Sequence, residues 1–585
     1  MLKRIYTNQT IDKIGQNVML KGWVQKVRDH GGLLFIDLRD VKGIVQVVIN
    51  PQINMSVYER AQTIGNEYVI SIEGHVVERQ LDLINPKLET GNIEVVASNL
   101  IILNKSKPIP FSIETDGHEI DENVRFKYRF IDLRRKRLLN SLKFRRDVTL
   151  FTRNWFNDHG FLEVETPILT VSSPEGARDY IVPSRVHKGK FYALPQAPQQ
   201  FKQLLMVGGI DKYFQIAPCF RDEDPRADRH SGAFYQIDVE MSFIEQQDLF
   251  DEMEPFFNDL ITRLVQTKKI LNYPFPQIPY TEAINKYGSD KPDLRFKMEF
   301  VDVSEIGHHS EFKVFNQSKF IKGIKAENCA NYTRNQIEEL TQFTISKGAK
   351  GMAWLKIQDE IESPIAKFFT KDQLNEIVQK FDGHKGDLIM FVADELNIVS
   401  KALGALRLEM GERLGLRDKN VLAFAWIVDF PFYEWDENNK KLDFAHNPFS
   451  WPKGGVESLN TLDPLSITAA QYDLVANGYE LASGGIRNHE PETLIKAFEI
   501  VGYDRSEVEK RFGHMLRAFE YGAPPHGGFA PGIDRLIMIL RDEPNIREIY
   551  AFPLNSNAED VMMGAPSVLD DNQLKEVGIT LRPVK

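Results

Sequence analysis

The first hundred residues contain five strand-like stretches, and this pattern restricts the N-terminal part of the chain to a small β-barrel. Apolar and polar side chains alternate in these stretches, and glycines stand between the first three. The stretches lie at residues 17–29, 31–40, 41–50, 66–79 and 91–105. Five strands are too few for most β-sandwiches, so the pattern favours a five-stranded barrel of the OB-fold type.

One face of this predicted barrel combines an aromatic side chain with polar ones. The aliphatic residues at 34, 36 and 38 point to one side of the second strand, so Phe35 points to the other. Gln46 lies among apolar neighbours on the third strand. Phe35 to stack on a base and Gln46 to hydrogen-bond one would form a reader of single-stranded nucleic acid. The alternative, a half-buried phenylalanine beside an incidental glutamine, stays open on these residues alone.

The chain is too long for one hydrophobic core. At 585 residues, with 42% hydrophobic and 26% charged residues, it is predicted to be globular and to contain several domains. Strand-like and helical segments mix beyond the barrel, which predicts an α+β class for the remainder. The predicted organisation is a barrel over 1–105, a hinge over 106–139, a mixed domain in two parts over 140–285 and 416–555, an inserted α+β module over 286–415, and an extension over 556–585.

Cysteine content and hydropathy limit the compartment. Cys219 and Cys329 are the two cysteines of the sequence, which excludes a disulfide framework and suits the reducing cytoplasm. The sequence contains no stretch of about eighteen apolar residues, so it predicts neither secretion nor a membrane span.

Residues 125–146 are strongly basic, although the net charge of the chain is −11. They hold ten Lys or Arg and a single acid, Asp132. Without interleaved glutamates the stretch cannot pair its own charges at i,i+4 spacing, which favours an anionic partner. A solvated helix face is the alternative.

Common nucleotide and metal motifs are missing from the sequence. It has no GxxxxGK[ST] phosphate loop, and the glycines at 527–532 lack the GxGxxG spacing of dinucleotide-binding folds. It also has no C-x-x-C, H-E-x-x-H or EF-hand pattern, which argues against a zinc site. A bound nucleotide therefore requires another arrangement of charged groups.

The stretch FRDEDPRADRH, residues 220–230, places three arginines and four carboxylates between two apolar strands. The returning strand carries Gln236, Asp238 and Glu240 on one face, so these groups either face water or line a site. Further along, Arg487 and Arg535 lie near glycines, a combination that suits phosphate because glycine permits close approach and a guanidinium binds oxygens bidentately. Carboxylates that escape pairing with arginine are candidate Mg²⁺ ligands.

Three stretches together resemble the signature motifs of the class II aminoacyl-tRNA synthetases. They are GFLEVETPIL at 160–169, the charged stretch at 220–230 followed by Phe234, and GGFAPGIDRL at 527–536. The stretches at 173–185 and 193–205, together with the inserted module, resemble the bacterial aspartyl type of this class. The resemblance covers essentially the whole chain. It implies an antiparallel sheet flanked by helices, an OB-fold that reads an anticodon, and a homodimer.

The resemblance also implies a reaction and its residues. L-Aspartate would react with ATP, aided by Mg²⁺, and the aspartyl group would pass to tRNA-Asp. The implied catalytic residues are Arg221, Arg535 and Glu480. The implied aspartate-binding residues are Glu175, Gln199, Lys202, Arg221, Asp238, His446 and Arg487. The implied ATP-binding residues are Arg221, Asp222, Glu223, His230, Glu480, Gly532, Ile533, Asp534 and Arg535. The implied metal ligands are Asp473 and Glu480, and the implied anticodon-binding residues are Arg28, Phe35 and Gln46.

Three residues depart from the usual pattern of this family. Ala197 stands where a serine is common, Ala233 where a glutamate is usual, and Asn447 where a second histidine is usual. These differences put in doubt the contacts to the amino group, to adenine and in the loop over the site, but leave the reaction type unchanged.

His30 raises the question of which tRNA is used. Members that accept only tRNA-Asp usually have leucine here, and histidine resembles the members that also charge tRNA-Asn. The sequence thus favours relaxed specificity, with a strictly tRNA-Asp enzyme as the alternative. A noncatalytic RNA-binding relative is disfavoured, because Arg221, Glu480 and Arg535 are all present.

Overall fold

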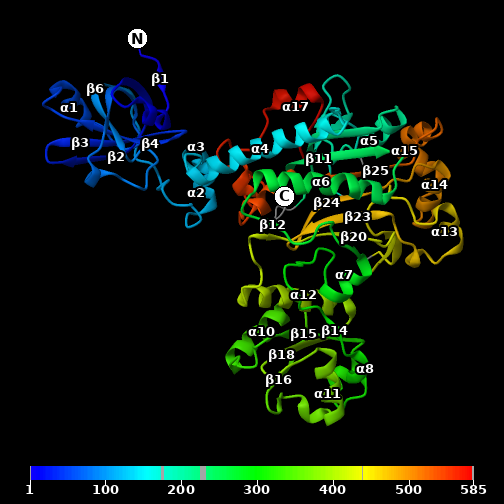
Figure 1. Cartoon of the computed structure of the whole chain (residues 1–585). Coiled ribbons are helices and arrows are strands. Elements are labelled where there is room, and N and C mark those ends of the chain that lie inside the picture. Colours follow the sequence, from blue (N-terminus) through cyan, green and yellow to red (C-terminus); the bar gives the residue numbers. More distant parts are fainter. Residues whose placement is uncertain (1, 173–176, 224–231, 438, 583–585) are drawn as a thin grey trace. The chain divides into compact units, whose positions relative to one another are not determined.

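The computed structural model of the chain describes residues 2–172, 177–223, 232–437 and 439–582 (Figure 1). The chain divides into two compact units, Met1–Arg135 and Lys136–Lys585. In the described ranges, no helix combines the length and apolar character needed to cross a membrane.

The first unit contains the predicted barrel. A short strand joins the sheet beside β2, and pairing of β2 with β5 closes the barrel. The strands are β1 (Arg4–Ile5), β2 (Asn17–His30), β3 (Leu33–Asp40), β4 (Gly43–Ile49), β5 (Val69–Glu78) and β6 (Ile93–Asn104). Helix α1 (Met55–Ala61) begins at Asn54, whose side chain accepts a hydrogen bond from the Val57 N–H. The five long strands confirm the OB-fold prediction.

The alternation predicted along the second long strand is confirmed. Leu34, Ile36 and Leu38 are buried in the barrel, whereas Phe35 and Asp37 are half-buried on the outer face. Since side chains alternate along a strand, burying the aliphatic set leaves the aromatic and charged set on the surface.

The arginines of the basic stretch 125–146 are paired within the protein. All seven of its arginines form ion pairs with carboxylates of the protein itself. Arg125 in α2 (Glu122–Lys127) and Arg129 in α3 (Arg129–Asp132) both contact Asp132. Three of the seven arginines pair with Asp132 inside the stretch, and others pair with distant carboxylates such as Glu67 and Glu543. The anionic partner of this stretch stays a prediction.

An eight-stranded sheet organises the second unit. Its order is β13-β20-β23-β24-β25-β11-β10-β7, antiparallel except at the β13–β20 and β10–β7 pairs. The bounds are β7 (Leu162–Glu163), β10 (Lys212–Phe220), β11 (Ala233–Ser242), β13 (Gln277–Pro279), β20 (Phe424–Val428), β23 (Gln471–Ala476), β24 (Tyr479–Ile486) and β25 (His526–Pro531). The predicted hairpin is present, because β10 and β11 pair over their whole length.

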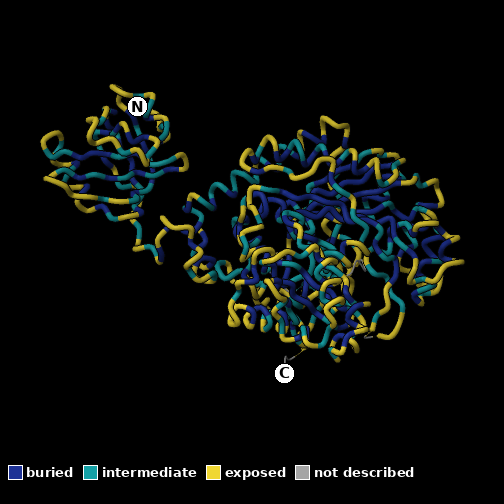
Figure 2. The backbone as a smooth tube through the Cα atoms, turned by 60° about the horizontal axis from the view of Figure 1, so that its bottom comes forward, coloured by how far each residue is buried: buried dark blue, intermediate teal, exposed yellow. Residues whose placement is uncertain are grey.

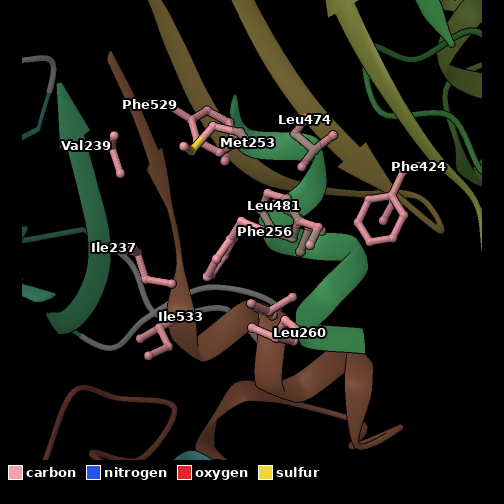
Figure 3. Close-up of a cluster of buried hydrophobic side chains, with 14 of the residues drawn as sticks. Ile237, Val239, Met253, Phe256, Leu260, Phe424, Leu474, Leu481, Phe529 and Ile533 are labelled. Atoms are coloured by element: carbon pink, nitrogen blue, oxygen red, sulfur yellow. The ribbon is translucent and has the colours of Figure 1, made fainter. Parts of the chain in front are cut away.

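Helices α4 (Lys136–Asp158), α5 (Gln199–Val207), α6 (Gln246–Leu264) and α16 (Ile533–Leu540) pack against this sheet. Helices α14 (Pro491–Ile500) and α15 (Arg505–Phe519) pack against each other, and α15 also packs against α5. In the core, Phe256 and Leu260 of α6 lie among Leu474, Phe529 and Ile533 (Figure 3). Most residues of β11, β23 and β25 are buried, and buried segments gather in the interior of the second unit (Figure 2).

A second sheet is formed by residues that lie, in the sequence, between the two parts of the chain that build the first sheet. Its order is β14 (Val301–Asp302), β15 (Phe320–Ala326), β18 (Leu388–Asp394), β16 (Ala353–Ile357) and β17 (Ile361–Glu362). Helices α10 (Arg334–Ser346) and α12 (Leu396–Arg413) pack in one hydrophobic cluster with this sheet, and α8 (Ser304–His308), α9 (Lys313–Gln317) and α11 (Lys371–Lys380) in another. This mixture of strands and helices agrees with the α+β character predicted for the inserted module. The domain boundaries themselves stay predictions.

Candidate active site

A cleft of about 660 Å³ opens beside the eight-stranded sheet. It is lined from β11, β23, β24 and β25, from the segment directly after β10, from α5, and from the start of α16. Antiparallel pairing brings these distant segments together; for example, Asp473 lies opposite Ser483, and Gln236 forms a bridge with Gly532. The predicted residues that line the cleft are Gln199, Lys202, Arg221, Glu223, Asp238, His446, Asp473, Glu480, Arg487, Gly532, Asp534 and Arg535.

The remaining predicted residues lie elsewhere. Glu175 and His230 fall outside the described residues. The backbone N–H of Asp222 donates to Arg178 O, and Asp222 is not among the described residues that line the cleft. The side chain of Ile533 is buried in the hydrophobic core.

Two cations and two carboxylates form a buried cluster at the floor of the cleft. Lys202 Nζ lies 2.8 Å from Asp238 Oδ1 and 3.1 Å from Glu240 Oε2. Arg487 donates to both oxygens of Glu240, at 2.9 and 3.2 Å. Each of the four side chains is at most 2% exposed, so these charges are held by one another and by the protein.

The two carboxylates of this cleft cluster differ in their surroundings. Burial raises the pKa of Asp238, with Lys202 opposing it. Glu240 is equally buried, but Arg487 and Lys202 together bring its pKa below the usual value. Asp238 Oδ2 is buried and has no hydrogen-bond partner among the described residues. Because a buried acceptor without a partner is costly, this oxygen marks a place where a ligand donor fits.

Arg221 lies directly after β10, at the entrance to the predicted loop. Its guanidinium stands 5.1 Å from the ring centre of Phe234, and its backbone N–H donates to Gly232 O at 2.8 Å. Its Nε is buried without a hydrogen-bond partner among the described residues. The ring therefore fixes the plane of a guanidinium that retains a donor for an anion.

Two neighbouring residues in the first turn of α16, Asp534 and Arg535, make different kinds of contact. Arg535 donates to the backbone oxygen of Glu480. The carboxylate of Asp534 accepts hydrogen bonds from Arg145, the Tyr550 hydroxyl and the Tyr235 N–H. With three protein donors already on its carboxylate, Asp534 is better suited to holding α16 in place than to contacting a nucleotide.

Two carboxylates stand at the other side of the cleft. Asp473 on β23 is buried, and burial together with nearby Glu480 raises its pKa well above the usual value. Its Oδ1 has no hydrogen-bond partner among the described residues. The described residues contain no cluster of three or more acidic, histidine or cysteine side chains arranged for a metal. Two carboxylates nevertheless suit Mg²⁺, which keeps several waters and takes further oxygens from phosphates.

His446 and Asn447 lie in the loop after β22 (Lys441–Phe444). The imidazole of His446 packs against the rings of Phe430 and Tyr280, and burial lowers its pKa. Asn447 Oδ1 accepts a hydrogen bond from the Phe449 N–H at 2.9 Å. The asparagine that departs from the family pattern therefore shapes this loop.

Several contributing residues were missed in the sequence. Glu240 was recognised as sharing the polar face of β11, but its role in holding Lys202 and Arg487 was not. Its period-two spacing with Asp238 was the available signal. Gln203 and His526, which hydrogen-bond each other behind the cleft, had no sequence signal.

The barrel brings together the three residues predicted to bind an anticodon. Arg28 lies opposite Phe35 in the β2–β3 register, and Arg28 Nη2 is 2.6 Å from Asp37 Oδ1. Asp37 in turn lies opposite Gln46, which places all of these side chains on one outer face. His30 is exposed at the end of β2.

Comparison with known families agrees with the fold and the cleft. Residues 121–556 match the family described as tRNA synthetases class II (D, K and N), and residues 18–103 match the family described as OB-fold nucleic acid binding domain. The chain is thus a class II tRNA synthetase.

Curated relatives define the family more narrowly. The aspartate–tRNA ligase of Streptomyces coelicolor is 50% identical over 571 residues, which cover 97% of this chain and 96% of the relative. The aspartate–tRNA(Asp/Asn) ligase of Rickettsia prowazekii is also 50% identical, over 583 residues that cover 98% and 96%. The chain belongs to the bacterial aspartate–tRNA ligase family.

Solved structures share the fold at lower identity. A putative aspartyl-tRNA synthetase from Leishmania major has a TM-score of 0.59 at 19% identity and covers 94% of both chains. Asparaginyl-tRNA synthetase from Pyrococcus horikoshii, complexed with asparaginyl-adenylate, has a TM-score of 0.58 at 18% identity, covering 94% of this chain and 98% of that one.

Proposed function

We propose that the enzyme activates L-aspartate with ATP, giving aspartyl-adenylate and pyrophosphate, and then transfers the aspartyl group to the 3′ end of tRNA-Asp. The observation that carries this proposal is the buried cluster of Lys202 and Arg487 with Asp238 and Glu240 in the cleft. Two fixed cations at a cleft floor match a small ligand with a carboxylate at its end.

Lys202 and Arg487 are proposed to bind the side-chain carboxylate of aspartate. Both are desolvated and held by Glu240, so their positions are set before the ligand arrives. Asparagine would offer an amide with only one acceptor oxygen and would bring N–H donors against two cations. Sites that leave buried polar groups unpaired reject an analogue by a factor of about 10⁴ or more.

The α-ammonium group of aspartate is assigned to Asp238 and Gln199, with Glu175 as a further predicted contact. Asp238 Oδ2 is a buried acceptor without a described partner, so an ammonium donor would satisfy it. This arrangement holds both ends of a small amino acid and leaves its α-carboxylate toward Arg221. His446 is proposed to close over the bound substrate.

Arg221 and Arg535 are proposed to act on the phosphates. The α-carboxylate of aspartate attacks the α-phosphorus in line, and negative charge grows on the phosphoryl oxygens and on the leaving pyrophosphate. Fixed guanidinium groups stabilise that charge without reorganising. Mg²⁺, when held by Asp473 and Glu480, supplies further neutralisation of the phosphate oxygens. Glu223 and Gly532 line the same cleft and complete the proposed ATP contacts.

The outer face of the barrel is proposed to read the anticodon, with Phe35 stacking on a base and Arg28 and Gln46 hydrogen-bonding. We further propose that tRNA-Asn is a second substrate, because His30 at the edge of this face offers hydrogen bonds that leucine lacks. The two curated relatives differ in this respect by name, so identity alone favours neither specificity.

A homodimer in the cytoplasm is proposed as the working form. The edge strand β7 and the segment after it carry the exposed apolar side chains Leu162, Ile168 and Leu169, which suit a second copy of the chain. Light scattering of the purified protein measures the assembly directly.

ATP–pyrophosphate exchange with each of the twenty amino acids tests the proposed reaction. Exchange that depends on aspartate alone supports it. Exchange that depends on asparagine or lysine instead would overturn the proposal and indicate a different synthetase. The absence of exchange with every amino acid would also overturn it and indicate a noncatalytic RNA-binding relative.

A further inference from the structure

A chain of hydrogen bonds runs behind the cleft from the backbone of residue 524 to Gln199. His526 Nδ1 lies 2.8 Å from Pro524 O, and His526 Nε2 lies 3.0 Å from Gln203 Nε2. At the far end, Gln199 Nε2 donates to Gln203 Oε1 at 3.0 Å. Gln203 and His526 are fully buried, and of the three side chains only Gln199 lines the cleft.

When the imidazole of His526 is neutral, only one arrangement of donors and acceptors satisfies this series of hydrogen bonds. A carbonyl oxygen only accepts, so the ring hydrogen must lie on Nδ1 and leaves Nε2 as an acceptor. The NH₂ group of Gln203 fills that acceptor, which turns Gln203 Oε1 toward Gln199. Gln199 then donates from its NH₂ group and keeps its oxygen, Oε1, for the cleft.

The charge of the ring decides whether this arrangement holds. Burial lowers the pKa of His526, and Arg487 and His489 lower it further, whereas Glu240 and the Pro524 carbonyl act in the opposite direction. The net result favours a neutral imidazole. A second ring proton would make Nε2 a donor, reverse the amide of Gln203 and then that of Gln199, and turn an NH₂ group into the cleft.

We propose that Gln203 and His526 are positioning residues that lock the amide of Gln199 with its oxygen toward the α-ammonium group of aspartate. This inference rests on the proposed function, because it assigns the α-ammonium group to Gln199 and Asp238. An ammonium group has donors only, so an amide presented the wrong way round would oppose it. We call the hydrogen-bonded series from Pro524 O through His526 and Gln203 to Gln199 the relay. Through it, Gln203 and His526 favour a substrate with an amino group although neither residue touches the substrate.

Replacing Gln203 by methionine tests the relay with the full-length enzyme. Methionine keeps a similar length and removes both hydrogen bonds. We expect Gln203→Met to raise the KM for aspartate about tenfold in ATP–pyrophosphate exchange, with kcat and the KM for ATP within about twofold, since a hydrogen bond to a charged group is lost. Succinate, which is aspartate without its amino group, should inhibit the variant and the wild type equally well.

The same helix provides a matched control. Gln200 contacts His514 in a second glutamine–histidine pair, and we expect Gln200→Met to leave the KM for aspartate within about twofold. His526→Gln keeps an acceptor for Gln203 and should restore most of the affinity that His526→Leu loses. Combining His526→Leu with Gln203→Met should add little to either change, since both break one relay.

The outcomes separate the relay from the proposed function. No aspartate-dependent exchange by the wild type would remove the proposed function. If the wild type shows aspartate-dependent exchange but Gln203→Met and Gln200→Met have the same KM for aspartate, the relay is overturned and the proposed function is not. A loss of kcat with unchanged KM, or a parallel loss of succinate binding, would also overturn it, because either result indicates a general distortion of the cleft.

Discussion

Each of the two units contains a buried cluster of opposite charges, and the clusters differ in balance and in access. In the first unit, Asp132 contacts Arg125, Arg129 and Arg135, the last two at 2.5 and 2.6 Å, and all four side chains are at most 4% exposed. In the second unit, two cations meet two carboxylates at the floor of a cleft of about 660 Å³.

The difference shows how similar groups serve structure in one place and recognition in another. The arginines around Asp132 are further engaged by protein: Arg135 also donates to Thr115 O and stands 5.4 Å from the ring centre of Phe111. Each cluster keeps a buried atom without a described hydrogen-bond partner, Arg135 Nη2 in the first and Asp238 Oδ2 in the second, but of these two residues Asp238 is the one that lines the cleft. A charged cluster enclosed by protein fixes a fold, whereas a cluster whose residues line a cleft is prepared for a ligand.

The largest effect is expected from removing a cation of the cleft cluster. Arg487→Leu leaves Glu240 with Lys202 alone and takes away one of two groups proposed for the substrate carboxylate. Aspartate-dependent pyrophosphate exchange should fall about a thousandfold or more in kcat/KM. The reason is that the buried Glu240 loses one cationic partner and the side-chain carboxylate of aspartate loses one of its two proposed cations. Arg487→Lys, which retains the charge, should recover part of the activity. Exchange near the wild-type rate in Arg487→Leu would refute the assignment of this residue.

The Asp132 cluster should respond in stability and leave catalysis largely unchanged. Asp132→Asn leaves three buried arginines without their shared carboxylate, which should lower the free energy of unfolding by about 3–5 kcal/mol. Urea denaturation measures this loss, and exchange by the folded variant should stay within about twofold of the wild type. Asp147, which pairs with Arg146 on the surface, gives the control. Asp147→Asn should cost less than about 1 kcal/mol; equal losses in the two variants would contradict the comparison.

The pH dependence of aspartate binding should reveal the unequal carboxylates of the cleft cluster. Burial raises the pKa of Asp238, and its binding of an ammonium group requires the charged form. The KM for aspartate should therefore rise as the pH falls, starting above the usual aspartate pKa of about 4.

The stability contribution of Asp238 has the opposite sign. A raised pKa in the folded state means that this contribution is fully present below the pKa of the unfolded chain and is lost as the pH rises.

Asp238→Asn should raise the KM for aspartate by about tenfold or more at neutral pH and make it nearly independent of pH. The KM for ATP, measured in the same series, serves as the control. A variant that keeps the wild-type pH profile would assign the titration to another group.

The sequence predicted most of the fold because its signals were local. Period-two stretches located the barrel strands and the β10–β11 hairpin. Asp238, Arg487 and Arg535 were singled out from their own spacing and neighbours, but Lys202 and the remaining cleft residues were predicted through the resemblance to a family, since no local rule brings Lys202 close to Arg487.

Long-range pairing explains what the sequence did not reveal. The basic residues at 125–146 were interpreted as a surface for an anionic partner, and three of the seven arginines there pair with carboxylates of other segments, Glu67, Glu543 and Asp534. Gln203 and His526 are 323 residues apart and meet only because α5 packs beside the sheet. Composition and periodicity carry no information about such contacts.

The smallest effect is expected at His30, which touches neither buried cluster. His30→Leu removes a polar side chain at the edge of the proposed anticodon face and leaves both units folded. We expect aspartylation of tRNA-Asn to fall about tenfold in kcat/KM, with tRNA-Asp within about threefold, since one hydrogen bond contributes about 0.5–1.5 kcal/mol. Assays with purified tRNA-Asp and tRNA-Asn measure both, and pyrophosphate exchange without tRNA should be unaffected. If the wild-type enzyme does not charge tRNA-Asn, the proposal of relaxed specificity falls while the cleft assignments stay intact, because anticodon recognition and aspartate activation are assigned to different units of the chain.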